Sequence, residues 1–335
     1  MKLSIITINY NNAEGLRKTL ASVAAQTYAD IEHIIVDGGS SDNSVEVIRD
    51  YSQSPIANTH EIRWISEKDK GIYNAMNKGI KIALGKRIVN DDHTSSPNSL
   101  IASSPYRLSD YIQILNSGDI LAAADVTEKM FQAMGNGQLA IDNDPNRLTS
   151  DSAPTSSPLA SRLSPIENGP AIFYGNMIKE YPDGRRVKDT CGGGDYTPES
   201  VLYFYKGTLN HDCAYIRRDL FEKYGLYNEQ MKICSDWEWY VRAIVLGGEK
   251  TVYTNIDVTV FDMTGISESD GKNRALIQQE RRAYLESMLP AAVLKDYDNY
   301  SFPILQYQRL KKYHLWGIVH FMERVLFKLD KWFKK

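Results

Sequence analysis

Short apolar runs alternate with segments of helical periodicity through the first third of the chain. The apolar runs predict buried strands at residues 2–9, 33–37, 62–66 and 111–115. Between them, apolar residues recur every three or four positions and predict helices, beginning with one that carries Leu16, Leu20 and Val23 on a single face. This alternation of strand and helix predicts an α/β fold with a mostly parallel, doubly wound, Rossmann-like sheet.

The second half of the chain is patterned less regularly. Strands are predicted at 171–174, 213–216 and 258–261, and helices at 218–224, 235–246 and 272–288. Two segments rich in Ser, Pro, Asn and Asp, 86–109 and 135–169, lack periodicity and are interpreted as surface insertions, either without structure or acting as lids. We therefore expect a catalytic-type domain over 1–270 and a helical region over 271–335.

The last twenty residues predict a basic amphipathic helix. Its apolar and cationic residues lie about 200° apart on a helical wheel, and Trp316 and Trp332 suit a boundary between water and lipid. The apolar stripe is Leu315, Val319, Met322, Leu326, Leu329 and Phe333, and the cationic stripe is Arg324, Lys328, Lys331 and Lys335. This pattern predicts a helix on an anionic membrane surface, and the alternative is packing against the domain or a partner.

Composition adds limits to this picture. The chain has 335 residues, a formal net charge of -3 and 24% charged residues, which is typical of a globular protein and gives no reason to expect a nucleic-acid partner. Three cysteines without metal-ligand spacing suggest a reducing compartment. The apolar start is too short for a signal peptide, so we expect a cytoplasmic protein, peripheral on the inner face of the plasma membrane.

Acidic residues follow three of the predicted strands, where parallel sheets bind their ligands. Asp37 precedes two glycines and suits a ribose or base edge, although it equally suits the cap of the next helix. Glu67 and Asp69 lie in a dense polar segment after the third strand, which suits either a ligand or a solvated helix start. Asp119 follows the fourth predicted strand.

Transfer chemistry on a diphosphate-activated substrate would give two of the acidic residues distinct roles. A departing diphosphate needs a divalent cation, Mg²⁺ or Mn²⁺, and Asp119 is the candidate ligand, with a turn aspartate as the alternative. Asp236 begins a helix and could take a proton from an acceptor hydroxyl, or could simply cap that helix. Trp237 could stack on a sugar or lie in the core, and His211 could touch phosphate or acceptor or be a satisfied polar residue.

Several motifs in order resemble the inverting family-two glycosyltransferases of the glycosyltransferase A fold, especially bacterial enzymes of surface-polysaccharide synthesis. These motifs span about residues 1–270 apart from the two insertions, and they are SIITINYNN, SVAAQTY, IIVDGGSSD, ISEKDKGIYNAMNKG, YIQILNSGD, LFEKYGLYNE, SDWEWYVRA and FDMTGIS. The resemblance implies transfer of a sugar from a nucleoside-diphosphate sugar, foremost a UDP-sugar, to a saccharide or lipid-linked saccharide, in surface polysaccharide or glycolipid assembly.

The resemblance also implies roles for particular residues. Thr7 and Tyr10 fall where the first loop contacts the nucleotide, and Asp37 holds the base. Asp69 lies near the base or ribose, with Glu67 beside it. The remaining roles are metal binding by Asp119, catalytic base for Asp236 and an acceptor contact for Trp237. The chain departs from the family at Gly118, where relatives often carry the first of two paired aspartates, and in the insertion after Gly85.

Two other classes of protein compete with this interpretation. A non-catalytic nucleotide-sugar-binding or scaffold protein could share the fold, but such a protein would not need the base carboxylate at Asp236. A dehydrogenase or nucleotidyltransferase could share the Rossmann-like sheet. No G-x-G-x-x-G turn follows the first strand, and this argues against a dinucleotide enzyme.

Overall fold

The computed structural model describes the chain except for residues 56–58, 87–107, 136–169, 192–197, 264–270 and 334–335. Both predicted insertions fall almost wholly in these gaps. The chain divides into two compact units, Met1–Arg281 and Arg282–Lys335, and the division falls within helix α8. In the residues described, no helix is both long and apolar enough to cross a membrane.

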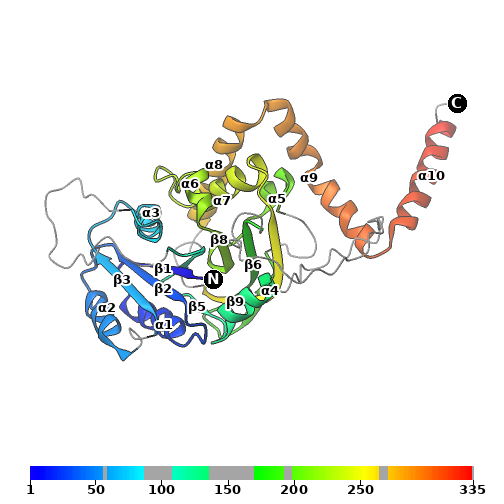
Figure 1. Cartoon of the computed structure of the whole chain (residues 1–335). Coiled ribbons are helices and arrows are strands. Elements are labelled where there is room, and N and C mark those ends of the chain that lie inside the picture. The colour runs from blue at the N-terminus through cyan, green and yellow to red at the C-terminus, as the bar shows by residue number, and fades with distance from the viewer. Residues whose placement is uncertain (56–58, 87–107, 136–169, 192–197, 264–270, 334–335) are drawn as a thin grey trace, which may run out of the picture. The chain divides into compact units, whose positions relative to one another are not determined.

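The amino-terminal part of the first unit has the predicted alternation (Figure 1). Its strands form the consecutive order β3-β2-β1-β4, and all three pairings are parallel. The strands are β1 Leu3–Asn9, β2 Ile31–Asp37, β3 Glu61–Ser66 and β4 Tyr111–Asn116, and the helices are α1 Ala13–Ala24, α2 Ser44–Gln53 and α3 Ile72–Ala83. The parallel, doubly wound prediction is confirmed for this part of the sheet.

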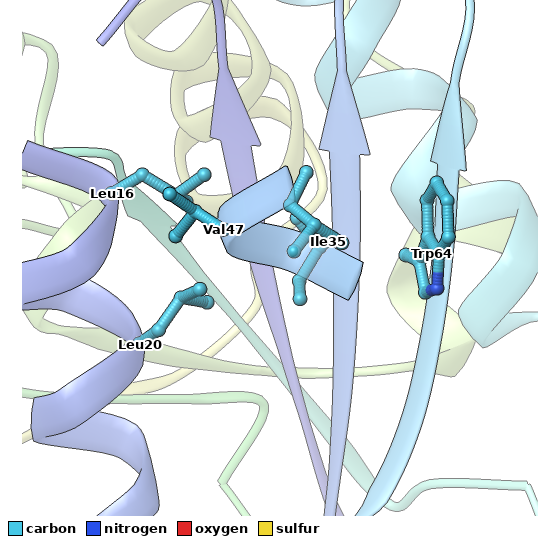
Figure 2. Packing of buried hydrophobic residues seen from close by; sticks show 6 residues of the cluster. Leu16, Leu20, Ile35, Val47 and Trp64 are labelled. Atoms are coloured by element: carbon cyan, nitrogen blue, oxygen red, sulfur yellow. The ribbon is translucent and has the colours of Figure 1, made fainter. Parts of the chain in front are cut away.

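Helices cover both faces of these strands. On one face Leu16 and Leu20 of α1, Val47 of α2, Ile35 and Trp64 form a buried apolar cluster, whose side chains are seen in Figure 2. Thr7 pairs with Ile35 in the parallel register, so the neighbouring residue Ile6 points to the opposite face. There α3 packs closely on β1, because a Cβ added to its Gly79 would lie only 2.3 Å from the Ile6 side chain.

The rest of the sheet is mixed rather than parallel. It continues from β4 through β8, β6 and β9 to β5, and β8 pairs antiparallel with both of its neighbours. Its strands are β5 Ile120–Leu121, β6 Ile172–Glu180, β7 Arg186–Asp189, β8 Ala214–Arg217 and β9 Thr251–Asp262. The sequence prediction was based on the strongly alternating first third, and the antiparallel reversal is made by strands too short or irregular to show it.

The helices of this part are shorter than those of the first. They are α4 Val126–Gly135, α5 Val201–Lys206, α6 Asp219–Lys223 and α7 Ser235–Tyr240, with a 3-10 turn at His211–Cys213 and a π-helical turn at Val241–Leu246 that continues α7. The helix predicted over 235–246 is therefore present, with a change of helix type near its middle. Helix α8, Gly271–Met288, follows β9 and the gap at 264–270.

The second unit is helical. It contains the end of α8, then α9, Ala291–Lys312, and α10, Trp316–Phe333. The predicted tail helix is confirmed as α10. On α10, Ile318, Met322, Leu326 and Leu329 are all exposed, so this apolar stripe is open in the described structure.

Candidate active site

Asp37 ends β2 and joins three strand ends at the edge where the parallel strands stop. Its carboxylate accepts hydrogen bonds from Asn9 Nδ2 at 2.9 Å, from the backbone and hydroxyl of Ser40 at 3.0 and 2.5 Å, and from Ser66 Oγ at 2.6 Å. Asn9 and Ser66 are the register partners of Asp37 on β1 and β3. With the side chain fully buried, these donors saturate the carboxylate, and Asp37 braces the edge of the sheet.

Beside Asp37, two predicted nucleotide contacts converge on a glycine. A Cβ added to Gly38 would lie 2.3 Å from Asp69 Oδ2 and 3.3 Å from the ring of Tyr10, so this position has room only for glycine. Tyr10 is 65% exposed. Burial raises the pKa of Asp69, although the Gly71 N–H and Lys78 oppose that rise. The exposed Tyr10 and the partly buried Asp69 thus lie together over the buried Gly38, next to Asp37.

Two other predicted donor contacts point elsewhere. The hydroxyl of Thr7 lies inside the sheet, 2.9 Å from His33 Nε2, and burial together with His60 lowers the pKa of His33 to about 3. Glu67 forms a 2.8 Å ion pair with Lys78 on α3. Thr7 therefore contributes to the core because its side chain is on the α1–α2 face, and Glu67 links the segment after β3 to the middle of α3.

Asp236 lies where four separate segments meet. Its Oδ1 accepts the hydroxyl of Tyr73 from α3 at 3.0 Å, and its Oδ2 lies 3.1 Å from His211 Nδ1 in the 3-10 turn. His211 Nε2 is in turn 3.3 Å from the side-chain amide of Asn116 at the end of β4. The side chains of Asp236 and His211 are 16% and 17% exposed. The sequence predicted Asp236 and His211 separately, and the structure brings them into contact.

The pKa values of this pair move in opposite directions. Burial would raise the pKa of Asp236, but the hydrogen bond and charge of His211, helped by Trp237 N–H and Tyr73, lower it. Burial would lower the pKa of His211, but Asp236 together with Asp212 and Asp119 raises it. The ionised carboxylate of Asp236 and the protonated imidazole of His211 therefore stabilise each other.

Asn116 can support this charge on His211. A protonated imidazole donates from both nitrogens, so its Nε2 needs an acceptor. The amide oxygen of Asn116 is buried without a partner, and turning the amide over would present that oxygen to Nε2. The sequence does not predict that Tyr73 contacts Asp236 or that Asn116 contacts His211. Its only signal is that both residues lie in or beside the acidic motifs.

Trp237 does not face the same opening as its neighbour Asp236. Its ring is 1% exposed, and its Nε1 donates to the carbonyl oxygen of Phe204 at 2.9 Å. The guanidinium of Arg281 covers the ring at 5.2 Å from the centroid. The expected stacking on an acceptor sugar is corrected here: successive helix positions diverge by about 100°, so Trp237 is directed into the core.

Asp119 lies in the tight turn between β4 and β5. It is 4% exposed, and its Oδ1 accepts the backbone N–H of Asp262 at 3.1 Å. Burial, with the charges of Asp212 and Asp262, raises its pKa well above the usual range, and His211 opposes this. Within the described ranges, no group of three or more His, Cys, Asp or Glu residues is arranged to hold a metal ion. Any cation here would have few protein ligands.

Comparison with solved structures defines the class of fold. The structure of Staphylococcus aureus TarS 1–349 with UDP-GlcNAc aligns at a TM-score of 0.54 and 12% identity, covering 93% of this chain and 73% of TarS. The mannosyltransferase PcManGT from Pyrobaculum calidifontis, with GDP-Man and Mn²⁺, aligns at 0.50 and 15% identity, covering 92% and 69%. The fold is that of the glycosyltransferase A class.

Sequence relatives then point to a family. Residues 4–101 match the model of glycosyl transferase family 2, so this segment is similar to that family. An uncharacterized glycosyltransferase from Nostoc sp. is 35% identical over 131 residues, which are 38% of this chain and 39% of that protein. A PGL/p-HBAD biosynthesis glycosyltransferase from Mycobacterium tuberculosis is 24% identical over 263 residues, 78% of this chain and 77% of the relative.

Proposed function

We propose that this protein transfers a sugar from a nucleoside-diphosphate sugar, foremost a UDP-sugar, to a hydroxyl of a saccharide or lipid-linked saccharide, with inversion at the anomeric carbon. The observation that carries the proposal is the environment of Asp236. Two partners from distant segments, Tyr73 and His211, hold its carboxylate at a partly open position and keep it ionised. A positioned carboxylate is the base that such a transfer needs.

In the proposed reaction the acceptor hydroxyl gives its proton to Asp236 as its oxygen attacks the anomeric carbon. The bond from that carbon to the diphosphate oxygen breaks on the opposite face, and the electron pair leaves with the nucleoside diphosphate. The transition state has oxocarbenium character, as in glycoside chemistry. His211 stabilises the ionised base before proton transfer and donates less to it afterwards, because the neutral acid attracts the imidazolium less.

The donor would lie along the carboxyl edge of the parallel strands. Tyr10 offers an exposed ring, Asp69 offers a carboxylate acceptor, and the absence of a side chain at Gly38 lets these two residues lie close together. TarS and PcManGT carry UDP-GlcNAc and GDP-Man on a similar fold, and this supports a nucleotide-sugar donor here. Asp37 then acts on the donor indirectly, by bracing the strand ends.

A divalent cation, Mg²⁺ or Mn²⁺, fits the charge around Asp119. Burial, together with the charges of Asp212 and Asp262, raises the pKa of Asp119, and a cation would relieve the part that comes from charge repulsion. Such ions take one or two carboxylates and complete their shell with phosphate and water, so Asp119 would hold it together with the donor's diphosphate. The cation would supply charge neutralisation for the departing diphosphate.

The tail helix suits an anionic membrane surface. Ile318, Met322, Leu326 and Leu329 form an exposed apolar stripe, and Arg324 and Lys328 lie on the opposite face. Flotation with anionic vesicles tests this role. The double variant Ile318→Ser/Leu326→Ser should lose vesicle binding, whereas Glu323→Gln should bind as the wild type does. Equal binding by the wild type and both variants would contradict the proposal.

The main test measures nucleoside diphosphate released from a panel of UDP- and GDP-sugars with saccharide acceptors. Wild type is compared with Asp236→Asn and with Asp183→Asn, a control on an exposed turn. Release by wild type and Asp183→Asn, but not by Asp236→Asn, is expected. Full activity of Asp236→Asn would remove it as the base. Donor binding without release by any protein would instead indicate a non-catalytic nucleotide-sugar-binding protein.

A separate experiment tests whether Asp119 binds the cation. Mn²⁺ binding to the protein with nucleoside diphosphate is measured by calorimetry for wild type and Asp119→Asn. Weaker Mn²⁺ binding by the variant is expected, and identical affinity would exclude Asp119 as a ligand.

A further inference from the structure

The helix that carries Asp236 begins without a side-chain cap of its own. Cys234 is the N-cap residue of α7, and its side chain makes no capping hydrogen bond. The first N–H groups of a helix, and those of the loop before it, have no partners within the helix. An uncapped start of this kind frays readily, and fraying here would displace Asp236, two residues inside α7.

Glu280 on α8 supplies the missing acceptors from 46 residues further along the chain. Its carboxylate accepts three consecutive backbone N–H groups, from Lys232 at 2.7 Å, Ile233 at 3.1 Å and Cys234 at 3.0 Å. Each of these bonds is charge-assisted, and the negative charge lies at the positive end of the α7 dipole. One side chain of α8 therefore fixes the backbone immediately before the helix of the base.

The same backbone segment is tied to the base from the other side. The carbonyl oxygen of Ile233 lies 2.5 Å from the hydroxyl of Tyr73, and that hydroxyl is also 3.0 Å from Asp236 Oδ1. Glu280, the 232–234 backbone, Tyr73 and Asp236 thus form one continuous set of contacts. A shift of this backbone would move both Tyr73 and the start of α7.

Two further residues of α8, Ile277 and Arg281, contact this turn and its surroundings. The thiol of Cys234 lies 3.7 Å from the carbonyl oxygen of Ile277, one turn before Glu280. Arg281 covers the ring of Trp237 and donates from Nη1 to the carbonyl oxygen of Gly207 at 3.2 Å. These contacts lie within the first compact unit, which ends at Arg281.

We propose that Glu280 is a positioning residue for sugar transfer: by binding the N–H groups of residues 232–234, it holds Asp236 in line with the acceptor hydroxyl. This inference rests on the proposed role of Asp236 as the base. It adds α8, which lies outside the family-matched segment 4–101, to the parts of the chain that the reaction needs.

Glu280→Gln is the sharpest variant because it keeps the size of the side chain. The amide has one acceptor oxygen, and its NH₂ group faces N–H donors that it cannot satisfy. Glu286→Gln is the matched control, since Glu286 is on the same helix in an exposed ion pair with Arg282. Glu280→Asp keeps the charge and is measured beside them, as a variant for which folding is less at risk.

The readouts separate positioning from general destabilisation. For Glu280→Gln we expect kcat to fall about 10- to 100-fold, because a small misplacement of a reacting group costs about that much. The donor KM should stay within about twofold, since the Tyr10–Asp69 surface is untouched. Hydrogen–deuterium exchange should accelerate at residues 232–237, Glu280→Asp should recover part of kcat, and Glu286→Gln should match wild type.

The outcomes also separate this inference from the proposed function. If Asp236→Asn is inactive while Glu280→Gln keeps wild-type kcat, Glu280 is not a positioning residue and the base assignment stands. A fall in kcat matched by Glu286→Gln, or one accompanied by unchanged exchange at 232–237, also overturns the Glu280 proposal. If Asp236→Asn keeps full activity, the proposed base fails, whatever Glu280→Gln does.

Discussion

Two aspartates, Asp37 in the amino-terminal part of the sheet and Asp236 in the carboxyl-terminal part, are held in contrasting ways. Asp37 is fully buried, and donors on adjacent strand ends and the next turn saturate its carboxylate. Asp236 keeps a partly exposed side chain between two partners. The comparison shows that a carboxylate after a buried strand can be structural although its motif suggests a ligand.

The difference comes from the kind of element that supplies the partners of each carboxylate. Ser40 lies three residues from Asp37, and Asn9 and Ser66 reach it through the regular parallel register. The partners of Asp236 lie 25 and 163 residues away, in a 3-10 turn and on α3. Adjacent strand ends and the following turn together supply enough donors to use every lone pair of Asp37, whereas the two partners of Asp236 leave its side chain partly exposed.

The largest expected effect separates the two aspartates directly. Asp236→Asn should lower kcat about 10³-fold, or about 4 kcal/mol in activation free energy, because the amide cannot accept the acceptor proton. Asp37→Asn should instead lower the melting temperature, because its amide group presents donors to donors. Initial rates and thermal unfolding of both variants provide the measurement. Similar kcat values for the two variants would erase the distinction.

The next effect concerns the core under the parallel strands. Leu20→Ala should lower the free energy of unfolding by about 3 kcal/mol, since it removes a buried side chain from the α1–α2 cluster. Urea unfolding gives the value, and kcat per folded molecule should not change. A loss of kcat at full folding would mean that this core does more than support the donor edge.

A smaller effect is the pH dependence of the stability that the His211–Asp236 pair contributes. The lowered pKa of Asp236 contributes stability above its ordinary 3.8 that is lost as pH falls through the folded value. The raised pKa of His211 contributes stability below 6.5 that is lost as pH rises through the folded value. The coupling between the two residues should therefore be greatest between the ordinary pKa of Asp236, 3.8, and that of His211, 6.5.

A double-mutant cycle measures this coupling without any substrate. Asp236→Asn, His211→Gln and the double variant are unfolded in urea at about pH 5 and about pH 9. A coupling of about 1 to 3 kcal/mol is expected at the lower pH and a smaller one at the higher. Equal coupling at both would show that His211 is neutral throughout.

The smallest predicted effect concerns the donor edge. Gly38→Ala should weaken nucleoside-diphosphate binding about tenfold, about 1.4 kcal/mol, because the new methyl group displaces Asp69 and Tyr10. Gly317→Ala is the control, as an added Cβ there meets no atom within 4 Å. Calorimetric titration with UDP and GDP gives both affinities. Unchanged affinity of Gly38→Ala for UDP and GDP would show that the nucleotide does not bind beside Gly38.

Much of the first half could be predicted from sequence because its elements are long and periodic. The predicted bounds of strands β1 to β4 agree with the structure within two residues at each end, and helix α1 carries Leu16, Leu20 and Val23 as predicted. The short strands β5 and β7 and helices α4 and α5 were missed, as were the antiparallel pairings of β8. Strands β5 and β7 and helix α5 have two to six residues, which are too few positions to show a period, and pairing direction depends on where the chain returns.

Local patterns and motif order were enough to predict the class of fold, a resemblance to family-two glycosyltransferases and the acidic residues after the strands. Which of those residues are free to act depends on the folded chain. It buried Thr7 and Trp237, saturated Asp37, and brought His211, Tyr73 and Asn116 to Asp236. The reason is physical: exposure and pKa depend on contacts between segments far apart in the chain, which neither spacing nor composition records.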